Sequence, residues 1–125
     1  EEKQPGIFVR RIAGKRATDQ EMLEYYKKEL EQVGGRSKGR WISSFVFVLD
    51  EENIKTYKLI EDRIFTTEMS SQVEEGLPLS SLALEPDSGR YISEITEKER
   101  KKSKKEADRK IYNMFLEISK VLKEK

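Results

Sequence analysis

The chain has 125 residues, enough for one domain with a core of its own. Its 25 Lys and Arg nearly balance 24 Asp and Glu, so the net charge of +1 creates no whole-molecule field toward a polyanion or an anionic membrane. It contains neither Cys nor His, which excludes thiol catalysis, Ser-His triads and the usual zinc sites. With no membrane-spanning apolar run and no signal-peptide pattern, we expect a cytoplasmic protein.

The first third of the chain predicts an extended segment and then a helix. The stretch PGIFVRRIAG is apolar, then basic, and ends at Gly14, which suits an extended segment that enters a turn. Thr18 and Glu21 have the spacing of a capping box, which predicts a helix over residues 19–33. Its apolar residues recur at helical intervals, and they are Met22, Leu23, Tyr26, Leu30 and Val33. The stretch GGRSKG is then predicted to be a loop.

The middle of the chain predicts strands. WISSFVFVLD is β-branched and aromatic, with Trp41, Phe45 and Phe47 on one face as candidate core residues. A polar turn over residues 50–53 joins it to IKTYKLI in a predicted hairpin, and RIFTTEM is a third extended segment. LPLSSLALEP, which contains Pro78, is predicted to be a strand edge or an entry turn.

The last segment predicts a long helix that starts at a second capping box, Thr96 and Glu99. Its predicted core-facing residues are Ala107, Ile111, Phe115, Ile118 and Leu122. Together the segments predict an α+β fold in which a mixed, largely antiparallel sheet is flanked by helices, within a single domain over residues 1–125.

The start of this helix is strongly basic, because EKERKKSKKEADRK holds eight Lys or Arg against four acids. One interpretation is a solvated helix face with Lys–Glu pairs across one turn. Another is an anion site at the helix start, although Ser103 lies about two turns inside it. The interspersed acids, and the lack of an aromatic residue before Tyr112, weigh against nucleic acid as a partner.

In this order the segments resemble the inosine-triphosphate pyrophosphatase family. PGIFVRRIAG is similar to the family's P-G-x-x-S-A-R-x-A-G segment, and GLPLSSLAL stands where the family has its G-F-G-Y-D-P purine loop. SEIT and SKK stand where it has an A-E-M turn and an S-H-R at the start of the last helix. The resemblance runs through nearly the whole chain, and it implies the later part of that family's fold.

The resemblance also implies which residues bind substrate. Arg11 stands at the Arg of the first motif, and Ser80 stands where the family has the Asp that reads the purine. Ser103, Lys104 and Lys105 stand at S-H-R, and the family's preceding Lys falls at Lys98 or Arg100. The catalytic residues themselves are not identified.

The implied activity is Mg²⁺-dependent hydrolysis of non-canonical purine nucleoside triphosphates to monophosphate and pyrophosphate. The resemblance also implies a homodimer that is not bound to a membrane. The family's triphosphate loop, metal-binding Glu and catalytic-site Asp precede its P-G segment, so we expect a partial domain whose Mg²⁺ ligands lie outside this chain. The substituted purine loop favours an alternative, a non-catalytic module that binds a nucleotide or a protein partner. Whether the chain is an enzyme stays open at this point.

Overall fold

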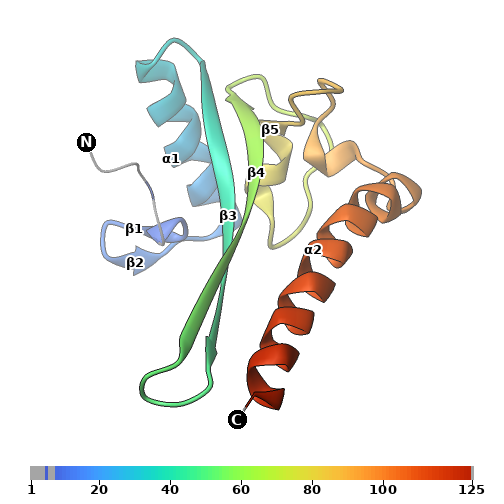
Figure 1. Cartoon of the computed structure of the whole chain (residues 1–125). Coiled ribbons are helices and arrows are strands. Elements are labelled where there is room, and N and C mark those ends of the chain that lie inside the picture. The colour runs from blue at the N-terminus through green and yellow to red at the C-terminus, as the bar shows by residue number, and fades with distance from the viewer. Residues whose placement is uncertain (1–4, 6–7, 125) are drawn as a thin grey trace. The chain divides into compact units, whose positions relative to one another are not determined.

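A computed structural model describes residues 5 and 8–124 of the chain, except for the side chain of Ser103 (Figure 1). The elements are β1 (Arg11–Ile12), β2 (Lys15–Arg16), α1 (Asp19–Gln32), β3 (Arg36–Val48), β4 (Ile54–Thr66), β5 (Ala83–Leu84) and α2 (Glu97–Lys123). Short 3₁₀ helices span Pro78–Ser81 and Ile92–Glu94. The predicted α+β class with antiparallel strands and two helices is therefore confirmed.

The chain forms two compact units, each described by itself below. Unit 1 comprises Glu1–Gly39 with Asp62–Glu94, and unit 2 comprises Arg40–Glu61 with Ile95–Lys125. One sheet has the strand order β3-β4-β5, and β1 and β2 form a separate two-stranded sheet.

Strands β1 and β2 of unit 1 form a tight antiparallel hairpin. Ile12 pairs with Lys15, so Ala13 and Gly14 are the two residues of the turn. Both have positive φ angles, 52° and 74°, as a type I′ turn requires. The predicted turn after the Pro-Gly segment is confirmed, with a non-glycine residue held in the left-handed region.

Helix α1 begins and ends where its local sequence signals predict. The Thr18 hydroxyl accepts the Glu21 N–H and the Glu21 carboxylate accepts the Thr18 N–H, which completes the capping box. At the other end the N–H of Gly35 donates to the Leu30 carbonyl at 2.8 Å, the long bond of a Schellman motif. Val33, predicted to face the core, is 63% exposed because it is already the C-terminal cap of the helix.

The prediction of a loop over GGRSKG holds only for Gly34 and Gly35, because β3 starts at Arg36. Gly39 lies inside this strand, against the ring of Phe65 on β4. A Cβ atom built on Gly39 would lie 2.5 Å from that ring, so no larger residue fits without movement. The glycine that suggested a loop is thus a packing position.

The prediction that IKTYKLI and RIFTTEM are two separate extended segments is also wrong, because β4 runs without interruption from Ile54 to Thr66. The acidic pair Glu61 and Asp62 lies exposed within the strand and makes no turn. Pro78 opens a 3₁₀ turn, and β5 follows as a short edge strand in which Leu84 pairs with Ile64. Both alternatives raised for this segment, an entry turn and a strand edge, therefore occur in succession.

The core of unit 1 lies around the 3₁₀ turn, where Leu82 and Ser81 have no exposed surface. The other buried apolar residues of this unit come from α1, β5 and the segment before α1, and they are Ala17, Met22, Leu23, Leu30, Ala83 and Leu84. These contacts hold the loop with Gly76 and Ser80 in place next to α1.

Unit 2 packs helix α2 on one face of the β3–β4 hairpin. Met114 and Ile118 are buried, and the Phe47 ring contacts the Phe115 ring edge to face with centroids 5.5 Å apart. Phe115 is nevertheless 56% exposed and Leu122 is 53% exposed, so the predicted inward stripe is wrong at these two positions. The inward positions instead follow the order Ala107, Ile111, Met114, Ile118 and Val121.

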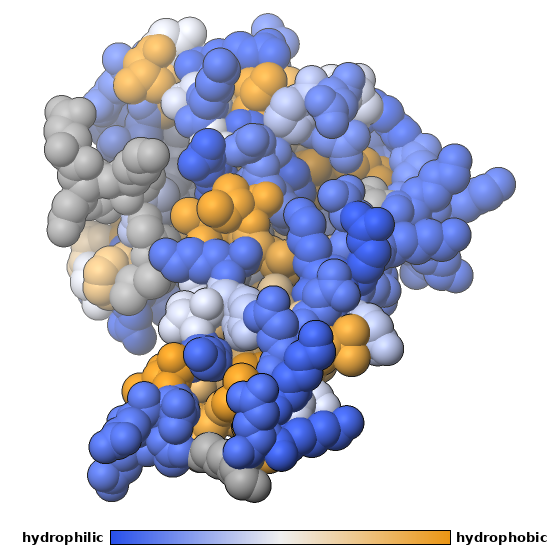
Figure 2. All heavy atoms as spheres, in the orientation of Figure 1, coloured by the Kyte–Doolittle hydropathy of each residue, from blue (hydrophilic) through white to orange (hydrophobic). Residues whose placement is uncertain are grey.

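Many large hydrophobic side chains remain at the surface, and Figure 2 shows them as orange patches among hydrophilic ones. Trp41, predicted to belong to the core with Phe45 and Phe47, is 46% exposed, whereas those two are half-buried. No helix in the described part of the chain is long and apolar enough to cross a membrane.

Candidate functional site

A polar cluster in unit 1 joins three segments that are distant in sequence. Arg10, next to β1, donates to the Asp19 carboxylate at 2.9 Å and to the Gly76 carbonyl at 2.9 Å. The Gly76 N–H donates to the other oxygen of Asp19 at 2.8 Å. Both backbone groups of Gly76 are thereby held, and the Pro-Gly segment is tied to the loop that precedes Ser80.

The electrostatics of this cluster centre on Asp19, the first residue of α1. The N–H of Gly76 and the Arg10 guanidinium both stabilise the charged carboxylate, and they lower the pKa of Asp19 below its ordinary value. A third hydrogen bond, from Arg10 to the Ala17 carbonyl at 3.2 Å, fixes the guanidinium further. Arg10 is therefore occupied in structure and is not available to a ligand.

Arg11, the residue predicted to bind substrate, lies one position further on in a different environment. It is exposed on β1 and is the cross-strand partner of Arg16 on β2. Like charges directly opposite each other on neighbouring strands are destabilising. Neither guanidinium makes an ion pair or side-chain hydrogen bond with another described residue, so no described acid compensates these two directly paired cations.

Ser80, predicted at the position of the purine-reading carboxylate, lies on the 3₁₀ turn. Its hydroxyl donates to the Leu77 carbonyl at 2.7 Å, which caps the turn locally. The structure thus places Arg11 and Ser80 in the same unit, and their segments meet through Arg10 and Gly76. Gly6, part of the same Pro-Gly motif, lies outside the described residues.

The first two residues of the SEIT turn, Ser93 and Glu94, belong to unit 1, whereas Ile95 and Thr96 belong to unit 2. The Ser70 hydroxyl donates to the Glu94 carboxylate at 2.5 Å, and the Ser70 N–H donates to the Ser81 carbonyl at 2.9 Å. Tyr91 donates its hydroxyl to the Glu68 carbonyl at 2.6 Å. Two of the four motif segments that carry the family resemblance therefore lie in unit 1, together with the first half of the SEIT turn.

The remaining predicted residues all lie on α2, in unit 2. Lys98, Lys104 and Lys105 are exposed, and so is Arg100, which has interactions of its own. The side chain of Ser103 lies outside the described part of the structure. The capping box of Thr96 and Glu99 is present, as predicted. These residues belong to unit 2, whereas Arg11 and Ser80 belong to unit 1.

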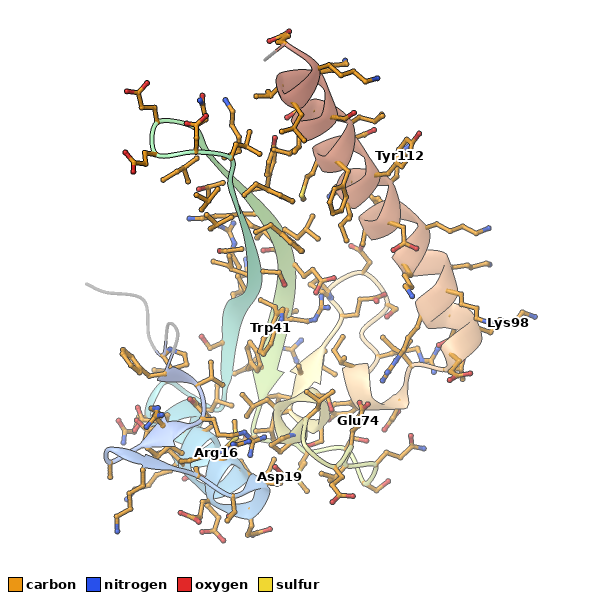
Figure 3. All side chains as sticks on the ribbon, turned by 90° about the horizontal axis from the view of Figure 1, so that it is seen from below. Arg16, Asp19, Trp41, Glu74, Lys98 and Tyr112 are labelled. Carbon is orange, nitrogen blue, oxygen red and sulfur yellow. The ribbon has the colours of Figure 1, made fainter. Side chains whose placement is uncertain are left out.

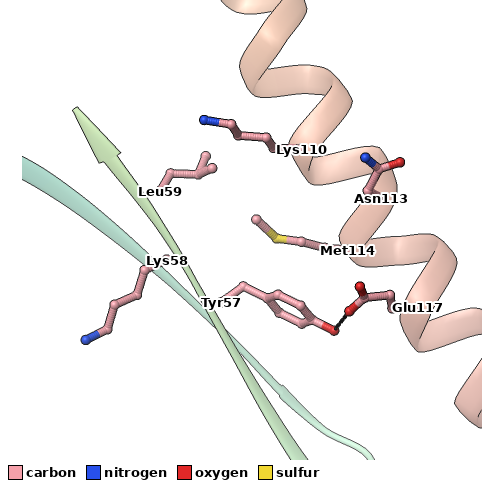
Figure 4. Close-up of a pocket in the computed structure, with 7 residues that line it drawn as sticks. All are labelled: Tyr57, Lys58, Leu59, Lys110, Asn113, Met114 and Glu117. Atoms are coloured by element: carbon pink, nitrogen blue, oxygen red, sulfur yellow. Dashed lines mark hydrogen bonds between the residues drawn. The ribbon is translucent and has the colours of Figure 1, made fainter.

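Unit 2 has an open depression between β4 and α2 that the sequence did not indicate (Figure 4). Tyr57 donates its hydroxyl to Glu117 at 2.8 Å, and this bond raises the pKa of Tyr57 above its ordinary value. Lys58, Lys110 and Asn113 supply its other polar groups. None of the predicted site residues lines this depression.

Arg10 and Asp19 are the residues that the sequence analysis missed. Arg10 is adjacent to the predicted Arg11, but nothing in the local sequence indicates that its partner is a backbone carbonyl 66 positions away. No group of three or more carboxylates able to hold a metal ion occurs among the residues that the structure describes. The resemblance places the Mg²⁺ ligands outside this chain.

Comparisons of the chain with protein-family models, with curated proteins and with solved structures give no match. Its function must therefore be argued from its own residues.

Proposed function

We propose that the chain is a relative of the inosine-triphosphate pyrophosphatases that acts on purine nucleoside triphosphates. The observation that carries this proposal is the link between Arg10, Asp19 and Gly76. It joins the Pro-Gly segment to the loop with Ser80, and these are two segments on which the resemblance rests. Such a nonlocal link supports a shared role for them.

The pair of Arg11 and Arg16 supplies the chemistry for the phosphates. Two guanidinium groups at directly paired strand positions repel each other, and a bound triphosphate would remove this repulsion through charge-assisted hydrogen bonds. Lys98, Arg100, Ser103, Lys104 and Lys105 remain proposed substrate-binding residues by resemblance. The homodimer is likewise part of the proposal, and equilibrium sedimentation tests it.

Hydrolysis of a phosphoanhydride requires neutralisation of charge and a positioned water, which Mg²⁺ supplies in enzymes of this kind. Because the resemblance places the Mg²⁺ ligands outside this chain, we assign no catalytic step to its residues. Its own residues bind and orient the triphosphate.

The test is release of pyrophosphate from inosine, xanthosine, adenosine and guanosine triphosphates by the intact gene product with Mg²⁺. We expect turnover of the non-canonical substrates, and a loss of about tenfold in kcat/KM for Arg11→Gln, because one charge-assisted hydrogen bond contributes roughly 1.5 kcal/mol or more. The control is Lys28→Gln, which removes an exposed cation from α1. Equal kinetics for the two variants would exclude the phosphate role of Arg11, and no turnover of any substrate would exclude the enzyme.

A second candidate is a module that binds the nucleotide without hydrolysing it. Two observations favour it: the Ser80 hydroxyl is bonded to its own turn, and the described residues lack a carboxylate cluster. Calorimetric titration with inosine triphosphate separates the candidates. Saturable binding without pyrophosphate release supports the module, whereas release supports the enzyme.

A further inference from the structure

We propose that the exposed side of helix α2 binds single-stranded nucleic acid along its phosphate backbone. This proposal rests on a line of cations whose spacing is close to the helical repeat, which places them on one side of α2. We call it the cationic stripe, and it consists of Lys98, Lys101, Lys102, Lys105, Arg109, Lys120 and Lys123. All of these residues are exposed.

The acids of α2 lie off this stripe, although the sequence mixes them with the cations. Glu99, Glu106, Glu117 and Glu124 are spaced by seven or eleven residues, so they follow a separate line along the helix. Asp108 lies at the border of the stripe. The acids that weighed against nucleic acid in the linear sequence are therefore largely sorted onto another side of the helix.

No acid in the described part of the chain neutralises the stripe. No member makes an ion pair or a side-chain hydrogen bond with another residue in the described part of the chain. The ion pair between Lys110 and Glu106, with an N–O distance of 3.8 Å, involves an acid of the separate line and no member of the stripe. A local surface of high positive charge thus exists on a chain whose net charge is only +1.

Two exposed apolar side chains fill the gap in the stripe between Arg109 and Lys120. Tyr112 is 63% exposed and Leu116 is 42% exposed, and both keep the spacing of the stripe. Figure 3 shows Lys98 and Tyr112 pointing from α2 to the same side, away from the β3–β4 hairpin. An exposed aromatic ring between phosphate-binding cations offers a stacking surface for a base.

The dimensions fit one strand of a nucleic acid. At a rise of 1.5 Å per residue, the stripe is about 37 Å long, and its cations fall in two groups, residues 98–109 and 120–123, separated along the helix axis by roughly 16 Å. It is a single line, so it matches the phosphates of one strand and not the two strands of a duplex groove. Its length also suits a site of several nucleotides.

An anionic lipid surface is a poorer match. An interfacial helix needs a wide apolar face toward the membrane. The apolar side of α2 is instead occupied by its contacts with the hairpin, where Met114 and Ile118 are buried. Tyr112 and Leu116 alone leave little apolar surface within the stripe.

The test measures binding of the chain to fluorescein-labelled oligothymidylate and oligouridylate of about 20 nucleotides, longer than a single site of up to roughly 16. The stripe variant combines Lys101→Gln, Lys102→Gln and Arg109→Gln, and omits Lys98 and Lys105 because these also belong to the proposed nucleotide site. The control combines Lys28→Gln, Lys38→Gln and Lys55→Gln, exposed cations elsewhere with the same loss of charge. Circular dichroism confirms that each variant is folded.

We expect binding near 50 mM salt that weakens steeply as salt rises, because each contacted phosphate contributes about −0.7 to the log–log slope. The stripe variant loses at least tenfold in affinity and its slope falls by about 2, whereas the control keeps both. Tyr112→Ala weakens binding by about tenfold without changing the slope, since a ring stacks on a base and releases no counterion.

Three results would overturn the proposal: no binding near 50 mM salt, equal affinity of the stripe and control variants, or binding to phosphatidylserine vesicles but not to oligonucleotides. The last result would assign the stripe to a membrane surface. None of them bears on pyrophosphate release, so the proposed function stands or falls separately.

Discussion

At the scale of single residues, the structure depends on charged groups whose partners are backbone atoms. Asp19 accepts from the Gly76 N–H and from Arg10, and both contacts favour the ionised carboxylate in the folded state. Because the pKa of Asp19 is lower in the folded than in the unfolded chain, its contribution to stability is complete above the unfolded value of about 3.8. That contribution is lost as the pH falls from there through the lower, folded-state pKa.

We therefore expect Asp19→Asn to destabilise the protein at neutral pH, and the difference from the wild type to narrow as the pH falls below 3.8. Urea unfolding of both proteins at a series of pH values measures this difference in the free energy of unfolding. The control is Glu31→Gln, exposed near the other end of α1, which should change the free energy of unfolding by less than about 0.5 kcal/mol at each pH. If the free energy of unfolding of Asp19→Asn differed from that of the wild type by the same amount at neutral and acidic pH, the ionised Asp19 carboxylate would not be the source of the stability.

At the scale of elements, Gly39 shows how one strand position is set by its neighbour on another strand. Glycine normally weakens a strand, yet here the ring of Phe65 covers the space a Cβ atom would take, at 2.5 Å. We expect Gly39→Ala to destabilise the protein by about 1–3 kcal/mol, because the half-buried ring must move. Chemical denaturation gives the value.

A double-mutant cycle isolates this pair. In a Phe65→Ala background the obstacle is gone, and Gly39→Ala should then be neutral or stabilising, since alanine restricts the unfolded chain more than glycine does. If Gly39→Ala lowers the free energy of unfolding by the same amount in both backgrounds, the close packing of the Phe65 ring on Gly39 is not the cause of the destabilisation.

The sequence predicted those elements whose ends are encoded locally. Both capping boxes, at Thr18 and Thr96, mark true helix starts because each is completed within one turn of the chain. The start of β3 was missed because the reason for Gly39 lies across the sheet in Phe65. The same holds for the candidate site. Arg11 could be predicted from a local motif, whereas Arg10 was missed because its partner, the Gly76 carbonyl, lies far along the chain.

At the scale of the whole molecule, the two units share their longest strands. Strand β3 passes from unit 1 to unit 2 after Gly39, and β4 passes back after Glu61. Each of these two strands runs across the unit boundary without a break in the chain, so a change in one unit can reach the other through the backbone. We infer that the units unfold together, as small domains commonly do.

Leu82→Ala tests this coupling, because Leu82 is fully buried in unit 1 and its truncation should cost about 2–5 kcal/mol. Trp41, the only tryptophan, lies in unit 2 and reports on that unit by fluorescence. If the units are coupled, the variant lowers the urea midpoint seen by Trp41 fluorescence as much as the midpoint seen by circular dichroism. Leu77→Ala is the control, since Leu77 is in the same segment but 54% exposed, and should shift neither. A Trp41 midpoint unchanged by Leu82→Ala would show that the continuous strands do not transmit the loss, and that unit 2 holds its fold alone.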